Sequence, residues 1–284
     1  MFEFIDLNKS QHSIALMCRL YGVSRHGYNS WRRRGESRRK REDSEIYPLI
    51  NRIFQKHEGC YGSPKITQEL RKQGVNVGQK RVARLMQEYG LKAVKARMYR
   101  TKAYQHVFQK ASPNRIKDFT PTGINQLWVA DVTYIRMPDE SWQYLSVIMD
   151  RYSRRIISWS LGENRTAELT SNTLARAMRN RKGAKNVILH SDKGIEYIAT
   201  SFRRKLHHYG IQQSMNGVKQ MNDNAHIESF FQDFKTERIK RKAFNTVDEL
   251  RGIISEYMRY YNHERSHSVI GYISPAKFES RIAV

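Results

Sequence analysis

The pattern of hydrophobic and polar positions changes near residue 125. Before that point, apolar residues recur at helical spacing in short segments that end at glycines. After it, segments rich in Val, Ile, Thr, Tyr and Trp alternate with helical segments in the order β-β-β-α-β-α-β-α. This order predicts an α/β fold in which a mixed five-stranded sheet carries helices on both faces, preceded by all-α units.

Residues 11–31 are predicted to form two short helices. The first ends at Gly22, and the second begins after Ser24, a residue that is favourable as an N-cap. Two helices joined by a tight turn are the layout of a helix-turn-helix.

A run of basic residues follows at 32–43. This run fits either a solvated linker or a linker that follows DNA phosphates, in which case Arg32 and Arg33 would contact DNA. We therefore expect residues 1–43 to contain an N-terminal helix-turn-helix and a basic linker.

A second helical unit is predicted at 44–101, with a last helix that ends at Gly90. Lys80, Arg81 and Arg84 lie on the first turns of that helix, where positive charge opposes the helix dipole and does not stabilise the helix. Such residues suit a recognition helix whose N-terminal turns meet DNA. We expect this unit to be a second helix-turn-helix-like DNA-binding domain.

The remaining boundaries follow from composition. Residues 102–124 lack periodicity and contain two prolines and a glycine, so we expect a linker there. The alternating strands and helices place the α/β unit at 125–245, and 246–284 is expected to be a helix followed by a loop-like tail.

The charge of the chain points to its partner. With 51 Lys and Arg against 27 Asp and Glu, the formal net charge is +24. Residues 1–124 carry 26 basic and 10 acidic residues, so the surplus is largest there. Self-repulsion of this size favours a polyanionic partner, and nucleic acid fits better than a membrane because no long apolar run or lipidation signal is present. With no signal peptide visible, we expect a cytoplasmic protein.

Two aspartates stand at strand positions where a charge is costly. Asp131 lies inside the first strand, between Ala130 and Val132, and aspartate is depleted in strands. Asp192 ends the short strand VILHSD, where an α/β sheet typically presents its ligands. Asp192 would also fit a turn before Gly194.

Glu228 and Lys235 lie seven residues apart on roughly the same face of one predicted helix. Glu228 is surrounded by apolar neighbours, although it would also fit a solvated helix position. Competing acids are Asp150, which better fits a structural role at a strand end, Asp223, which better fits an N-cap, and Glu196.

Taken together, Asp131, Asp192 and Glu228 are separated by 60 and 35 residues. With the words WVADVTYI, VILHSDKGIEY, NDNAHIESFFQDFKTE and YYNHERSHSVIGYISPAKFE, this spacing resembles the integrase core of bacterial insertion-sequence transposases of the DDE superfamily. The similarity is to the OrfB product of the family with two overlapping reading frames. HEGCYGSPKI and VARLMQEYGL resemble its preceding helix-turn-helix domain.

The resemblance implies a ribonuclease-H-like core in which Asp131, Asp192 and Glu228 are the catalytic, metal-binding triad. It implies two Mg²⁺ ions, with Mn²⁺ as a substitute, which support strand cleavage at the inverted repeats of the element and then strand transfer. Lys235 matches a basic residue that contacts the transposon end. The loop VKQM departs from the family pattern.

The resemblance also implies DNA as substrate, at least a dimer on DNA, and an upstream-frame product as partner or fusion. The residues Asn262, Arg265 and His267 match the family's C-terminal pattern, as a clamp for the tail or as DNA contacts. One alternative is a DNA-binding regulator or inhibitory partner with an inactive core. A ribonuclease-H-type hydrolase is a further rival, whereas Cys18 and Cys60 cannot build the zinc module of a retroviral integrase.

Overall fold

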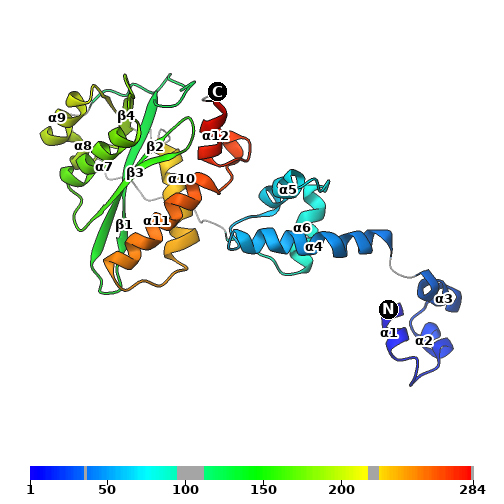
Figure 1. The fold of residues 1–284 in the computed structure, drawn as a ribbon. Helices are drawn as coiled ribbons and strands as arrows, with labels where there is room; N and C mark the ends of the chain where they lie inside the picture. The colour runs from blue at the N-terminus through cyan, green and yellow to red at the C-terminus, as the bar shows by residue number, and fades with distance from the viewer. Residues whose placement is uncertain (35–36, 95–111, 217–223, 283–284) are drawn as a thin grey trace. The chain divides into compact units, whose positions relative to one another are not determined.

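The five predicted strands form one mixed sheet (Figure 1). The strands are β1 (Leu127–Arg136), β2 (Trp142–Asp150), β3 (Ile156–Gly162), β4 (Ile188–Ser191) and β5 (Gln212–Met215). Their order in the sheet is β3-β2-β1-β4-β5. The pairs β1/β2 and β2/β3 are antiparallel, and the pairs β1/β4 and β4/β5 are parallel. The predicted α/β fold with a mixed five-stranded sheet is thus confirmed.

This computed structural model describes residues 1–34, 37–94, 112–216 and 224–282. The predicted cap Asp223 and the loop VKQM lie outside the described residues, as do residues 102–111 of the predicted linker at 102–124. The chain divides into two compact units, Met1–Lys92 and Ala93–Val284.

Side chains alternate between the two faces of the central strand β1, and each face has its own hydrophobic core. Val129 and Ile135 belong to the core formed with α10 and α11, whereas Trp128 and Val132 belong to the core formed with α7 and α9. Figure 1 shows α7, α8 and α9 on one side of the sheet and α10 and α11 on the other. These helices are α7 (Ala167–Asn180), α8 (Ile195–Ile198), α9 (Thr200–His208), α10 (Ala225–Phe234) and α11 (Val247–His263).

The C-terminal tail differs from the loop that was predicted. After the 3₁₀ turn η3 (Ser268–Ile270), it forms the helix α12 (Pro275–Ile282). Proline suits the first turn of a helix, and the buried Glu279 ties the helix to the unit through Ser153 and Arg155. Tertiary contacts therefore stabilise a helix that is too short to be evident from periodicity.

The N-terminal unit is all-α. Its six helices within the described residues are α1 (Phe2–Leu7), α2 (Ile14–Leu20), α3 (Arg25–Arg34), α4 (Arg38–Lys56), α5 (Ser63–Lys72) and α6 (Gln79–Glu88). One small core lies among α1, α2 and α3, and a separate core lies among α4, α5 and α6. The predicted helix pair and the N-cap Ser24, whose Oγ accepts from the amide of Gly27 at 2.9 Å, are both present.

The basic run at 32–43 is largely helical, which corrects the prediction of a linker. Helix α3 continues to Arg34, and α4 begins at Arg38 after Ser37, whose side chain accepts from the amide of Lys40. The predicted boundary between residues 43 and 44 therefore falls inside α4. No helix in the described ranges combines the length and the apolar character that crossing a membrane requires.

Candidate active site

Two adjacent parallel strands place Asp131 and Asp192 beside each other: Asp131 lies inside β1, and Asp192 directly follows β4. Ala130 of β1 pairs with Ser191 of β4 as the last pair of that register, so the two aspartates come next on adjacent strands. The Oδ1 of Asp131 accepts from the amide of Val132 at 2.7 Å. Burial and the negative charge of Asp192 raise the pKa of Asp131 to about 8. The structure thus brings together two carboxylates that repel each other.

Glu228 stands in the first turn of α10. Ile227 and Phe230, on the same helix, are buried in the core against the sheet, whereas Glu228 itself is exposed. Although its side chain is exposed, partial desolvation and then the charge of Asp192 raise the pKa of Glu228, and Glu228 in turn contributes to the raised pKa of Asp131. The helix therefore presents the third carboxylate within electrostatic reach of Asp131 and Asp192.

The three carboxylates do not form a closed ligand set in this conformation. Within the described residues, no three His, Cys, Asp or Glu side chains are gathered tightly enough to hold one metal ion. Their donor chemistry nevertheless fits a hard divalent cation, which prefers carboxylate oxygens and leaves room for substrate phosphates. A cation would also relieve the repulsion that raises the pKa of Asp131.

An ion pair between the partly exposed Arg165 and the buried Glu196 lies next to Asp192. Arg165, in the loop before α7, contacts the Oε1 of Glu196 at 2.7 Å and the Oδ2 of Asp192 at 3.5 Å. The carboxylate of Glu196 is buried, and a Cβ at Gly194 would lie 2.5 Å from its Oε1, so a side chain there would displace this carboxylate. The structure thus makes Glu196, considered above as a competing acid, the partner of Arg165.

Lys235 follows α10 at the start of the π-helix η2 (Lys235–Ile239). Its Nζ lies 4.6 Å from the ring centroid of Tyr134 on β1. Burial lowers the pKa of Lys235, although the negative charge of Asp131 opposes the shift. Lys235 is thus placed near the triad.

Two exposed aromatic residues near the site were not predicted. Tyr134 is 57% exposed and Trp142 is 43% exposed, and their rings meet edge to face at a centroid distance of 5.2 Å. Aromatic rings left exposed beside a cation are typical of surfaces that stack on nucleic-acid bases. The available sequence signal was two large aromatic residues flanking a turn at the end of a hairpin.

Asp150 has a structural role, as its position at the end of β2 suggested. Its carboxylate is fully buried and accepts from the amides of Asn125, Tyr152 and Ser153. These bonds fix the turn after the strand.

The tail residues also act as structural clamps. Asn262 bonds both the amide and the carbonyl of Ile156. Arg265 is buried and contacts Asp233 at 2.6 Å and Glu237 at 2.8 Å. Since these polar groups are engaged within the unit, the clamp accounts for Asn262 and Arg265 without DNA. The backbone of His267 forms an isolated antiparallel β-bridge with Ile273.

The basic residues of α6 have unequal surroundings. Arg81 contacts Asp43 at 2.6 Å, and Arg84 contacts the same carboxylate at 2.5 Å. These pairs join α6 to α4, so two of the three residues have a stabilising role that the helix-dipole argument did not foresee. Lys80 remains exposed.

The other basic candidates are on α3. Arg33 is exposed, and the exposed Arg32 lies 3.9 Å from Asp6. Pairs at this distance between exposed groups contribute little to stability.

Comparison with known proteins agrees with this architecture. Residues 121–220 and 209–275 match models of the integrase core domain, and residues 40–99 match the HTH-like domain. The chain is 34% identical over 284 residues to the transposase InsF for insertion sequence IS3A of Escherichia coli K12, covering 99% of this chain and 98% of the relative. It is 36% identical over 267 residues to an uncharacterized 31 kDa protein of insertion element IS600 from Shigella sonnei, covering 93% of this chain and 98% of that protein.

Solved structures give weaker similarities. A simian T-cell lymphotropic virus intasome complex aligns with a TM-score of 0.49 at 13% identity, over 81% of this chain and 74% of that one. The HTLV-2 integrase catalytic core in complex with magnesium aligns with a TM-score of 0.42 at 16% identity, over 55% of this chain and 97% of that one. The nearly full-length sequence identity is the stronger finding, and it shows that the chain belongs to the family of IS3-type insertion-sequence transposases.

Proposed function

We propose that this transposase cleaves and joins DNA strands through Asp131, Asp192 and Glu228. The observation that carries the proposal is the register of β1 and β4, which brings two carboxylates side by side with the charge of Glu228 acting on both. The three would hold two Mg²⁺ ions, with Mn²⁺ as a substitute. When bound, such ions activate the attacking oxygen and stabilise the leaving one.

The other residues of the site would position the substrate. Lys235 is a cation close to Asp131, so it can hold a phosphate of the element end next to the triad. Without metal, Arg165 can neutralise Asp192. When a cation binds Asp192, Arg165 would remain paired with Glu196, because Glu196 is its closer partner. The residues of this chain would thus orient the phosphodiester and hold the three carboxylates close together.

We assign recognition of the terminal inverted repeats to the helical unit, with Lys80, Arg32 and Arg33 as exposed candidates for phosphate contacts. Arg81 and Arg84 would act there mainly by holding α6 in place. Two element ends must be brought together, so we expect at least a dimer on DNA.

An end-cleavage assay tests the proposal. The full chain is incubated with a labelled duplex that carries the terminal repeat and flanking DNA, with Mg²⁺, with Mn²⁺ or with EDTA. We expect cleavage in Mg²⁺ that Asp131→Asn, Asp192→Asn or Glu228→Gln each reduces by at least about 10³-fold, with binding of the duplex unchanged. A triad variant that still cleaves at the wild-type rate would overturn the assignment.

One observation favours the regulatory alternative. The three carboxylates are not gathered into a ligand set, and Arg165 contacts Asp192. A regulator would bind the terminal repeat without cleaving it in either metal. The same assay, repeated after fusion to the upstream-frame product, distinguishes an inactive core from a core that needs its partner.

A further inference from the structure

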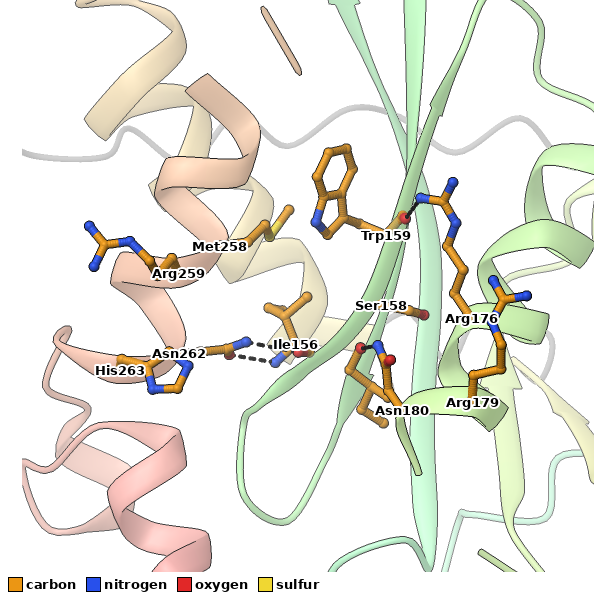
Figure 2. A pocket seen from close by; sticks show the side chains of 11 residues that line it. Ile156, Ser158, Trp159, Arg176, Arg179, Asn180, Met258, Arg259, Asn262 and His263 are labelled. Atoms are coloured by element: carbon orange, nitrogen blue, oxygen red, sulfur yellow. Dashed lines mark hydrogen bonds between the residues drawn. The ribbon is translucent and has the colours of Figure 1, made fainter. Parts of the chain in front are cut away.

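A cleft of about 600 Å³ lies at the far edge of the sheet from β5, between β3, α7 and α11. Trp159 of β3, Arg176 and Arg179 of α7, and Arg259 and His263 of α11 line it (Figure 2). Since β2 separates β3 from β1, the cleft is about 10 Å across the sheet from the strand of Asp131. It is therefore not part of the triad.

The positive charge of this cleft is poorly compensated. Among the described residues that line it, none is acidic. In the described parts of the chain, Arg176 bonds the carbonyl of Trp159 at 3.2 Å, and Arg179 has no ion pair. Arg259 meets Glu264 at 3.3 Å, with both side chains largely exposed. Because like charges repel, several basic groups facing one cleft favour an anionic occupant.

Two other kinds of occupant fit poorly. An added peptide strand needs free backbone groups along an edge strand. On β3 those groups are bonded by side chains: Asn262 bonds Ile156, and Asn180 bonds the carbonyl of Ile157 at 2.8 Å. A second copy of the chain, docked symmetrically, would bring the same arginines face to face.

A phosphodiester chain matches the remaining features. Arginine forks suit phosphate oxygens, and a partly exposed indole suits a base or a sugar. Figure 2 shows the arginines of α7 and the residues Arg259 and His263 of α11 on opposite sides of β3, so a strand running along the edge would meet positive charge on both sides. We propose that this cleft binds a DNA segment outside the catalytic centre, through its phosphates.

The proposal rests on the proposed function only in taking DNA as the substrate. It predicts contacts without sequence preference, because phosphates carry no base information. These contacts would hold DNA that extends beyond the reacting phosphodiester, on the side of the unit opposite β5.

Charge reversal in the full chain tests the proposal. Binding of labelled duplexes of arbitrary sequence is measured by fluorescence anisotropy over a range of KCl concentrations, for wild type and for the double variant Arg179→Glu/Arg259→Glu. We expect the affinity to fall at least about tenfold for every sequence. We also expect the plot of log K against log[KCl] to become less steep, its negative slope losing about two in magnitude. Cross-linking of bromodeoxyuridine-substituted DNA is expected to reach the Trp159 peptide.

The matched control is Arg204→Glu/Lys185→Glu, which makes the same change in net charge at two exposed positions outside the cleft. Equal losses of affinity and slope in both double variants would show a general field effect and overturn the site. Unchanged DNA binding by the cleft variant would also overturn the site. A cleft variant that differs from wild type only in its sedimentation without DNA would do the same. If wild type binds DNA but never cleaves, the proposed function fails while the cleft stands; if cleavage persists and the cleft variant binds normally, only the cleft fails.

Discussion

Two groups of acids in the catalytic unit differ in what neutralises them. Glu279 of α12 accepts bonds from Ser153 and Arg155 at 2.6 Å and also pairs with Arg181. Burial alone would raise its pKa, but hydrogen bonds from Arg181 and Ser153 hold the pKa of Glu279 below its ordinary value. At Asp131, burial and the charge of Asp192 instead raise the pKa to about 8.

Glu279 is thus an acid that stabilises the fold, whereas Asp131 and Asp192 are acids that we propose bind a cation. A buried carboxylate surrounded by arginines stabilises the native state as a charged group. A carboxylate facing other carboxylates destabilises the native state when charged, and it persists where a cation supplies the missing charge. Neutralising the two kinds of acid should therefore change stability in opposite directions.

The largest expected effect is at Glu279. Glu279→Gln leaves Arg155 and Arg181 without their anion and should lower the free energy of unfolding by about 3 kcal/mol. Urea denaturation at neutral pH measures the loss. The exposed Glu140→Gln is the control, and an equal effect in both variants would contradict the stabilising role of Glu279.

Glu279 also gives the stability a pH dependence. Because its pKa is lower in the folded state than the ordinary 4.5, its contribution is present above that value and is lost as the pH falls through the folded pKa. Denaturation curves between neutral and acidic pH should therefore show the gap between wild type and Glu279→Gln closing on acidification. If the difference in the free energy of unfolding between the two proteins stays constant with pH, the charge of Glu279 is not what stabilises the folded state.

Asp131 should behave in the opposite way. At neutral pH and with metal removed by EDTA, Asp131→Asn should raise the free energy of unfolding by about 2 kcal/mol, because the raised pKa of Asp131 means that its carboxyl takes up a proton on folding, a cost that the amide of Asn does not carry. The control is Asp248→Asn, whose carboxyl is almost fully exposed. If Asp131→Asn instead destabilises the protein in EDTA, then Asp131 and Glu279 do not differ in the way described.

The smallest effect is expected in the helical unit. Asp43→Asn weakens the pairs with Arg81 and Arg84, which are partly exposed, so the loss should be about 1 kcal/mol. Thermal unfolding of the variant measures it. If these arginines serve mainly to position α6, the affinity for duplex DNA should fall together with the stability. A gain in affinity would show instead that Asp43 competes with DNA for the two arginines.

Much of the fold could be predicted because long segments carry their own periodicity. The helices α7, α10 and α11 each bury one face, and the longer strands are rich in apolar residues because both faces of the sheet are covered, so sequence alone shows them. The helices α8 and α12 are short, and α12 depends on the contacts of Glu279 with residues more than 90 positions away. The basic run at 32–43 looked like a linker because charge says little about helicity.

The candidate site divides in the same way. Asp131 and Asp192 could be found because an acid in or after a buried strand is conspicuous. The pairing of Arg165 with Glu196, and of Arg81 with Asp43, joins residues 31 and 38 positions apart, which no local pattern encodes. Such pairs decide which charges are free for a ligand.

The central claim is that Asp131, Asp192 and Glu228 bind divalent cations. Thermal unfolding of the full chain, with and without saturating MgCl₂, tests it most directly, since a ligand that binds only the folded state stabilises by about 2.7 kcal/mol at a hundred times its Kd. We predict that Mg²⁺ stabilises the wild type and leaves Asp131→Asn/Asp192→Asn unchanged. Equal stabilisation of both proteins, or none in the wild type, would contradict the account.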